Sequence, residues 1–450
     1  MPGMKSSLKC CRLALPLLCL TIPRMRKVAS NAGIGAKRFG PTDYIKISIF
    51  GFALTALWSS LHTIVIQLRL LDFVAESQKN TYLGLLIGTG LILAMVVQPI
   101  AGAISDRSGF GWGRRRPYIL MGTILAMLFI PGIGFCGSFV ALFIIYCLLQ
   151  VSCNTAHGPY QAFIPDLVPG GKRGLASGVK TLLEFVGGIA LLYLIAPFMD
   201  NYSTGKGISW LWLSLGVLAI VLLGAMIATV LMVKERPGTG GSKLPLLPTL
   251  LYRSFKIDVK KNRDFVWFLV SRLLILMAFS TFQKFALYFL MDVVGITSPG
   301  AVTANLLIVV GVCMAATVYP AGRLSDKVGR KPIVVSSGLL SALSIMLLFF
   351  STSYGYIMLC GALLGISFGA FMSTNWALAT DLVAKGEEAR YLGLTNLATA
   401  GGSALSLFII GPMIDFFNAH SLNLGYKVMF LACFIFLVAG SLLALKIKRR

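Results

Sequence analysis

Acidic residues are scarce in this sequence. Asp and Glu together number 16 of 450 residues, and charged residues of both signs make up only 12%. A soluble globular domain has about a quarter of its residues charged. Since 57% of the chain is also hydrophobic, the composition excludes an ordinary soluble domain and indicates a protein that crosses a membrane several times.

Motifs of enzymes are also lacking. The sequence contains no glycine-rich nucleotide loop, and its nine cysteines show no spacing typical of metal ligands. The three histidines, His62, His157 and His420, have no acid or nucleophile at a readable spacing. We therefore expect no enzymatic activity, no cofactor and no bound metal.

Long apolar segments are what the sequence does contain. Each has about twenty residues or more, enough for a helix to cross about 30 Å of hydrocarbon. They predict an all-α membrane protein with twelve transmembrane helices, at about 44–66, 81–104, 117–136, 138–163, 175–198, 208–233, 264–291, 300–321, 332–350, 354–379, 392–414 and 425–445.

Basic residues are distributed unevenly between the loops. Most of the 40 Lys and Arg residues lie in the two terminal tails and in the loops after the even-numbered segments. The loops on the other side contain only Arg69, Lys79, Lys206 and Lys427. By the positive-inside rule both termini are cytoplasmic, and the net charge of +24 meets anionic lipid rather than nucleic acid. We expect a monomer in the plasma membrane.

The chain divides into four parts on these grounds. Residues 1–40 are basic without any acid, and we expect a cytoplasmic tail. A transit or signal segment, or a true start at Met25, are the alternatives. Two bundles of six helices follow, at 41–233 and 264–450, and a basic cytoplasmic linker at 234–263 joins them.

Two motifs recur between the halves. The pattern G-x-x-S-D-(R/K)-x-G, followed by a basic run and Pro, occurs at 102–117 and again at 322–332. Asp-Leu-Val occurs at 166–168 and again at 381–383. Six segments separate the members of each pair. Because an even number of spans preserves orientation, the halves form two parallel six-helix pseudo-repeats.

Twelve spans in two sixes, with this loop motif in both halves, resemble the major facilitator superfamily. The run Gly-Arg-Arg-Arg-Pro-Tyr at 113–118 and the run from Gly158 to Leu167 resemble the glycoside–pentoside–hexuronide:cation symporters and the plant sucrose/proton symporters. The resemblance implies a transporter whose first, fourth, seventh and tenth spans line a central cavity.

The sequence departs from these families at the acids that couple transport to cations. Residues 81–104 contain none of the acids that sodium-coupled members carry in the second span. Asn154 and His157 stand where sucrose symporters carry an acid in the fourth span. The fifth span has Gly187-Gly188 but lacks the Gly-Pro signature of drug/proton antiporters. These departures disfavour sodium coupling and drug export.

The repeated loops predict a gate. We expect the two leading glycines to let helices approach closely, the two acids to cap neighbouring helices, and the basic residues to pair with these acids or with acids of the other half, such as Glu387. The alternative is that the charged residues of these loops only set the orientation of the chain in the membrane. The expected gating residues are Gly102, Asp106, Arg107, Arg114, Gly322, Asp326, Lys327 and Arg330.

Polar side chains in the four central spans predict the solute site. On the fourth span, four polar residues at i, i+4, i+7 and i+11 fall within about 60° of each other. Amides suit sugar hydroxyls and Trp suits a pyranose face, although interhelical hydrogen bonds would explain the same residues. The expected contacts are Trp58, His62, Gln150, Asn154, His157, Gln161, Arg272, Gln283, Asn375 and Trp376.

Glu184 is the only acid well inside a span. It lies about 15 Å deep and Arg272 about 12 Å deep from the same side, which permits an ion pair. Lys284, near the outer end of its span, is expected to extend toward the interface, with a role in the solute site as the alternative. We expect a secondary transporter of a small polar organic solute, a sugar or glycoside, that uses alternating access and proton symport with Glu184 as the coupling group. For Glu184 a static structural ion pair is the alternative, and His62 and His157 are the next candidates for coupling. An exporter or uniporter of an amphiphile, or a receptor or assembly factor that no longer transports, are the alternatives.

Overall fold

The computed structural model describes residues 40–235, 262–350, 353–382 and 388–448. Most of the tail and the linker predicted from the sequence lie outside these residues, as does Glu387. The described part of the chain is helical and contains no β-strand. Twelve helical stretches in it are long and apolar enough to cross a membrane, which confirms the predicted number of spans.

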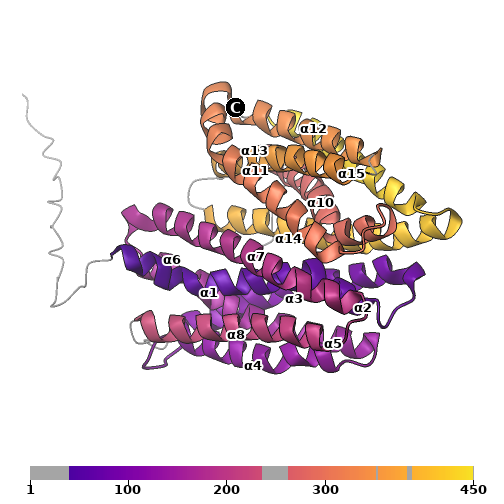
Figure 1. Ribbon diagram of the computed structural model, residues 1–450. Helices are drawn as coiled ribbons and strands as arrows, with labels where there is room; N and C mark the ends of the chain where they lie inside the picture. The colour runs from indigo at the N-terminus through magenta and orange to yellow at the C-terminus, as the bar shows by residue number, and fades with distance from the viewer. Residues whose placement is uncertain (1–39, 236–261, 351–352, 383–387, 449–450) are drawn as a thin grey trace, which may run out of the picture. The chain divides into compact units, whose positions relative to one another are not determined.

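The first half consists of six spans, which Figure 1 shows in indigo to magenta. Span 1 is assembled from α1, the π-helical turn η1 and α2, and extends beyond the predicted 44–66 at both ends. The elements are α1 (Pro41–Ser60), η1 (Leu61–Val65), α2 (Ile66–Leu70), η2 (Glu76–Gln78), α3 (Lys79–Asp106), α4 (Arg116–Phe135), α5 (Phe139–Gln161), α6 (Phe163–Leu167), η3 (Gly170–Lys172), α7 (Arg173–Ser203) and α8 (Ser209–Met232).

The second half also consists of six spans, which Figure 1 shows in pink to yellow. They are α10 (Arg263–Asp292), α11 (Pro299–Val328), α12 (Arg330–Phe349), α13 (Tyr354–Leu382), α14 (Glu388–His420) and α15 (Leu424–Leu445).

Helix packing repeats between the halves. In the first half α3 and α4 pack on α5, and α1 packs on α7 and α8. The equivalent helices of the second half pack in the same way: α11 and α12 on α13, and α10 on α14 and α15. Two parallel pseudo-repeats of six helices therefore form the fold, as the sequence predicts.

The halves meet along two seams. In one seam α3 packs on α14, and in the other α7 packs on α11. At the α3/α14 seam, a Cβ added to Gly84 would lie 2.3 Å from the Leu407 carbonyl oxygen, and one added to Gly411 would lie 2.4 Å from that of Asn80. Glycine is therefore required at both positions, because no side chain fits between the backbones.

The π-helical turn η1 lies in the middle of span 1. It contains His62 and Thr63, and the Gln67 amide donates to the His62 carbonyl at 2.9 Å. A π turn shifts the backbone register, so a side-chain donor can satisfy a carbonyl that the α-helical pattern would have paired. The turn brings Thr63 to the central cavity described below.

Candidate functional site

A cavity of about 430 Å³ lies between the two halves. Its walls come from α1, η1, α3 and α7 of the first half and from α10, α11, α13 and α14 of the second. Cavities of this size take small organic ligands. Its polar lining is formed by Thr55, Ser59, Thr63, Glu184, Ser280, Gln283, Lys284, Thr399 and Ser403.

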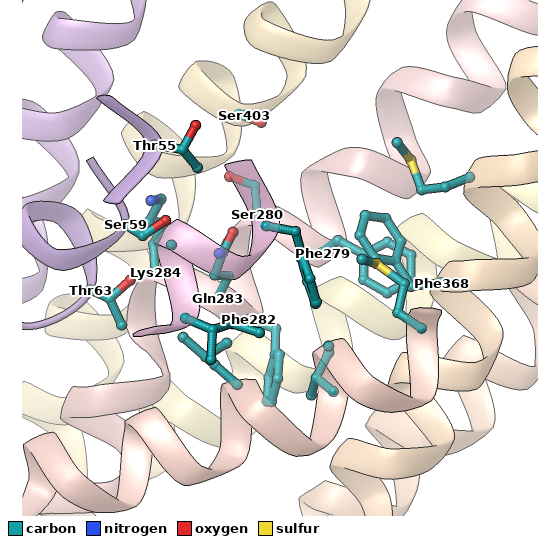
Figure 2. Close-up of a pocket in the computed structure, with 18 of the residues that line it drawn as sticks. Thr55, Ser59, Thr63, Phe279, Ser280, Phe282, Gln283, Lys284, Phe368 and Ser403 are labelled. Atoms are coloured by element: carbon teal, nitrogen blue, oxygen red, sulfur yellow. The ribbon is translucent and has the colours of Figure 1, made fainter. Parts of the chain in front are cut away.

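Hydroxyl groups and aromatic rings share this cavity. Figure 2 shows Thr55, Ser59 and Thr63 on one side, across from Ser280 and Gln283 of α10. Phe279, Phe282 and Phe368 supply apolar ring surface. This combination suits a polyhydroxylated solute, whose hydroxyl groups need hydrogen bonds and whose ring carbons need an apolar surface.

The polar stripe on α5 forms a chain of hydrogen bonds rather than a wall of this cavity. The His62 ring lies 2.8 Å from the Tyr146 hydroxyl, to which Gln150 also donates at 2.8 Å. Asn154 donates to the Gln150 side chain at 2.9 Å. Trp58 packs against the His62 ring with centroids 4.9 Å apart. These groups are satisfied by each other in this conformation.

Gln98 of α3 extends this chain of hydrogen bonds, and it is not among the site residues predicted from the sequence. Its amide donates to Asn154 at 2.8 Å and lies 2.7 Å from the His157 ring, whose other nitrogen lies 3.2 Å from Gln161. A lone amide in an otherwise apolar span was the available signal. The contacts join residues of two different spans, which helical spacing within one span cannot reveal.

A second polar cluster surrounds Arg272 of α10. Its guanidinium donates to the Asn375 side chain and, at 3.1 Å, to the Thr399 hydroxyl. The Trp376 ring centroid lies 5.5 Å from its Cζ atom. The structure thus brings three predicted residues together, and Thr399 connects them to the cavity.

Glu184 and Gln283 are the predicted site residues that line the cavity. Glu184 makes its ion pair with Lys180 at 3.6 Å, one turn earlier on α7. The expected pair between Glu184 and Arg272 is not formed in this conformation, because Arg272 bonds to neutral groups instead. Lys284 was expected to extend toward the interface, and that expectation was wrong: it lines the cavity.

We call the end of the bundle that carries the repeated loops the basic end. Arg115, which the sequence analysis passed over, organises it in the first half: it pairs with Asp106 and, at 3.1 Å, with Asp166. Arg114 also pairs with Asp166, at 2.6 Å. In the second half Arg330 pairs at 2.6 Å with Asp381, the repeat partner of Asp166.

The expected helix cap by Asp106 was wrong: among the described residues its carboxylate bonds to the Arg115 side chain and to no backbone N–H group. Asp326 and Lys327 are exposed, and a buried guanidinium nitrogen of Arg107 has no hydrogen-bond partner among the described residues. The ion pairs of Arg114, Arg115 and Arg330 at this end each join residues of one half.

The expected close approach at the loop glycines is found at Gly102 but not at Gly322. A Cβ added to Gly158 of α5 would lie 3.1 Å from the Gly102 backbone nitrogen, so α3 and α5 approach closely there, whereas a Cβ added to Gly322 would meet nothing within 4 Å. Both glycines accept hydrogen bonds through their carbonyl groups, from Ser105 at 2.8 Å and from Ser325 at 2.7 Å.

The opposite end of the bundle is held by bonds between the halves. Lys79 at the start of α3 pairs with Asp292 at the end of α10, at 2.6 Å. The N-termini of α3 and α11 therefore both lie at this end. The repeated loops follow the C-termini of these two helices, so both loops lie at the basic end.

Two carboxylates at this opposite end cap helices of the other half. Asp200 accepts the backbone N–H groups of Gly300 and Ala301 at 2.7 and 2.9 Å. Asp415 accepts the backbone N–H of Thr81 at 2.6 Å and the Asn80 side chain at 2.8 Å. A carboxylate is favoured at a helix N-terminus by free N–H groups and by the helix dipole. We call these two caps the acid latches.

A repeat in the sequence could have revealed the latches. Ala-Pro-Phe-Met-Asp at 196–200 and Gly-Pro-Met-Ile-Asp at 411–415 share Pro and Asp. The two runs are separated by the same distance along the chain as the two copies of Asp-Leu-Val, at 166–168 and 381–383.

Comparison with known sequences identifies the family. The family model described as MFS/sugar transport protein matches residues 49–447. The sucrose transport protein SUT1 of Oryza sativa subsp. japonica is 32% identical over 187 residues, which cover 35% of each chain. The uncharacterized symporter YnaJ of Bacillus subtilis (strain 168) is 24% identical over 358 residues, 73% of each chain. The match to the sucrose transporter thus spans about a third of its length.

Solved structures show the same fold. A D-xylose-proton symporter superposes with a TM-score of 0.68 at 17% identity, covering 91% of this chain and 98% of the other. The nucleoside transporter NupG superposes with a TM-score of 0.71 at 13% identity, covering 90% and 99%. These proteins are transporters and not enzymes. With the family model matching nearly all of the twelve-helix region, the chain belongs to the major facilitator superfamily, in its MFS/sugar transport protein family.

Proposed function

We propose that the protein is a secondary transporter that carries a small polar organic solute, a sugar or glycoside, across the plasma membrane by alternating access with proton symport. One observation carries the proposal: a cavity lined by hydroxyl groups and aromatic rings lies between two halves that are bonded together at one end. The sugar-transporter relatives support the solute class.

The distribution of polar bonds supports alternating access. One ion pair and two caps join the halves at the opposite end, whereas the ion pairs of Arg114, Arg115 and Arg330 at the basic end each stay within one half. We place the basic end, with both termini, in the cytoplasm on the positive-inside argument. The cavity is then closed toward the outside, and transport requires the acid latches to open.

Glu184 is our candidate for the proton site. It is the one carboxylate among the described residues that lines the cavity, and its partner Lys180 lies on the same helix. A carboxylate there binds a proton when the cavity faces one side and releases it when its surroundings change on the other. Arg272 is the candidate for a second partner in the alternate state.

Proteoliposomes separate coupled transport from the alternatives. We expect wild-type protein to accumulate a sugar when a pH gradient is imposed, and Glu184→Gln to retain solute counterflow while it loses that accumulation. Accumulation in Glu184→Gln would refute its coupling role. Equilibration without accumulation in the wild type would indicate a uniporter, and binding without any flux would indicate a receptor.

A further inference from the structure

A second hollow lies on the surface of the second half, and we call it the outer groove. Its volume is about 470 Å³, and it runs between α11 and α12, which both pack on α13 as its floor. It shares no lining residue with the central cavity. Leu324 and Ile366 on its walls are 49% and 38% exposed. The groove therefore opens at the outside of the bundle, where membrane spans face lipid.

The hydroxyl groups that line the outer groove are already used as donors. Each of them donates to a backbone carbonyl of its own helix, at 2.7 to 3.2 Å. The four residues are Thr317, Ser336, Ser337 and Ser367. A polar ligand would find no free hydroxyl donor there, whereas a hydrocarbon chain needs none. The lining thus favours an apolar occupant.

The outer groove is as deep as one leaflet of a bilayer. Its wall on α12 runs from Ile333 to Leu340, and its wall on α11 runs from Leu324 to Thr317. Both walls begin close to the repeated loop and reach about 15 Å into the span, at a rise of about 1.5 Å per residue. Since the hydrocarbon core is about 30 Å thick, the groove extends from the basic end to the middle of the membrane.

Two cations border the outer groove at the basic end. Lys327 lies two turns after Pro320 on the same face of α11, and it makes no ion pair with the described residues. The Arg323 guanidinium lies over the Tyr319 ring, 5.4 Å from its centroid. The nearest acid along the helix is Asp326, which points about 100° away from Lys327. Positive charge therefore remains at the mouth of the groove.

The other cations of this loop are engaged by the protein. Arg330 pairs with Asp381 of α13 at 2.6 Å. The Lys331 ammonium group donates to the Ile447 carbonyl at 3.0 Å. These bonds hold the walls together, so Lys327 and Arg323 are the two that can meet a ligand.

We propose that the outer groove binds an anionic phospholipid of the cytoplasmic leaflet. One acyl chain fills the groove, and the phosphate group is bound by Lys327 and Arg323. The basic end is cytoplasmic on the positive-inside argument, and the cytoplasmic leaflet carries anionic lipid. The site is separate from the central cavity, so its test does not depend on the proposed transport function.

The first half carries larger side chains at the equivalent positions. Alignment of the two repeated loops on Pro117 and Pro332 places Tyr118 where α12 has Ile333. The same alignment places Met121 at the position of Ser336. A tyrosine and a methionine take up space that the smaller side chains of α12 leave open. We therefore expect this site in the second half.

Photolabelling locates the lipid on wild-type protein. Nanodiscs of phosphatidylcholine receive a trace of phosphatidylglycerol or phosphatidylcholine with a diazirine in one acyl chain, and labelled residues are identified by mass spectrometry. We expect phosphatidylglycerol to label the groove residues of α11, α12 and α13 at least about 5-fold more than phosphatidylcholine does, the factor that one cation contributes toward anionic lipid. Equal labelling by the two lipids, or label spread evenly over the outer surface, would overturn the proposal.

Variants test the groove and the charge separately. Ser336→Trp fills the groove and should abolish the label there, whereas Leu339→Trp, on the same helix and 43% exposed but outside the groove, should not. Lys327→Gln should lower the preference for phosphatidylglycerol about 5-fold. Lys427→Gln, an exposed lysine at the start of α15, is its control.

Thermal unfolding shows whether each variant is folded. Full labelling of the groove in folded Ser336→Trp, or an unchanged lipid preference in Lys327→Gln, would contradict the site. If Ser336→Trp does not fold, the wild-type labelling pattern and the Lys327→Gln preference decide.

Discussion

Asp200 and Asp415 are repeat-related and form the same contact. Each carboxylate accepts N–H groups from the first turn of a helix in the other half, at Gly300–Ala301 and at Asn80–Thr81. The two capped sites are themselves repeat-related, because they are separated along the chain by the same distance as the loop glycines Gly102 and Gly322. The opposite end is therefore closed by two equivalent carboxylate caps, one from each half.

Removing a latch should favour the state that is open at this end. Asp200→Asn and Asp415→Asn each lose a charge-assisted acceptor and turn an N–H group toward the N–H groups of the helix. We expect each change to destabilise the closed state by about 1–3 kcal/mol. Spin labels at Lys206 and Leu422, in a cysteine-free background, should report longer distances between the halves.

Asp72→Asn is the matched control for the latch variants. Asp72 lies at the same end, but its partners, Arg69 at 2.8 Å and Tyr202, belong to its own half. This variant should leave the distance distribution unchanged. Unaltered distances in both latch variants would show that the carboxylates do not hold the halves together.

Glycine at the α3/α14 seam should be equally important for closure. In Gly411→Ala the new methyl group would lie 2.4 Å from the Asn80 carbonyl oxygen, so the two helices must separate. We expect a lower thermal unfolding temperature and a larger open population in the same distance measurement. Gly224→Ala, where nothing lies within 4 Å, should be tolerated. Equal behaviour of the two variants would contradict the close packing.

Arg115 should contribute more to the stability of the basic end than Arg107 does. Its side chain is 4% exposed and pairs with Asp106 and Asp166. Arg115→Gln leaves both acids without this partner and should cost about 1–3 kcal/mol, which a chemical denaturation curve measures. Arg107→Gln removes a side chain for which the described residues offer no acid, and it should cost less. A larger loss in Arg107→Gln would reverse this ranking.

Glu235 should make stability depend on pH. Its carboxylate follows α8 and accepts the Arg115 backbone N–H at 2.8 Å. Burial raises the pKa of Glu235, although the hydrogen bonds from Arg115 and Arg116 partly oppose this. The folded state thus binds the proton more tightly than the unfolded state, so this contribution to stability is present below the unfolded pKa, about 4.3, and is lost as pH rises through the folded pKa.

Glu235→Gln tests this sign. The variant should lose less thermal stability than the wild type between pH 4 and pH 7, because glutamine does not titrate. Glu76→Gln, at a side chain that is 85% exposed, is the control and should follow the wild-type profile. A steeper loss in Glu235→Gln would show that the ionised form is the favoured one.

The architecture was predictable from the sequence because a bilayer restricts it strongly. Each span needs about twenty apolar residues, which predicts the number of helices. The charge of the loops predicts the orientation of the spans, and the two repeated motifs predict which spans of the two halves correspond. The site was less predictable. The polar residues on α5 do lie on one face of the helix, but they form hydrogen bonds with Gln98 of α3 and with Tyr146 of α5 itself. Lys284 was misjudged because depth along a span says nothing about which side of the helix faces the cavity.

The two seams between the halves differ in one respect. Gly84 and Gly411 bring the backbones of α3 and α14 into contact, whereas the repeat-related positions of the α7/α11 seam are Ala304 and Ala196. We expect the methyl groups there to keep α7 and α11 further apart at these two positions. We expect the latch at Asp200 to release before the latch at Asp415, so that one side of the bundle acts as a door and the other as its hinge. The two halves are otherwise alike, so the difference between alanine at one seam and glycine at the other would decide which seam opens first.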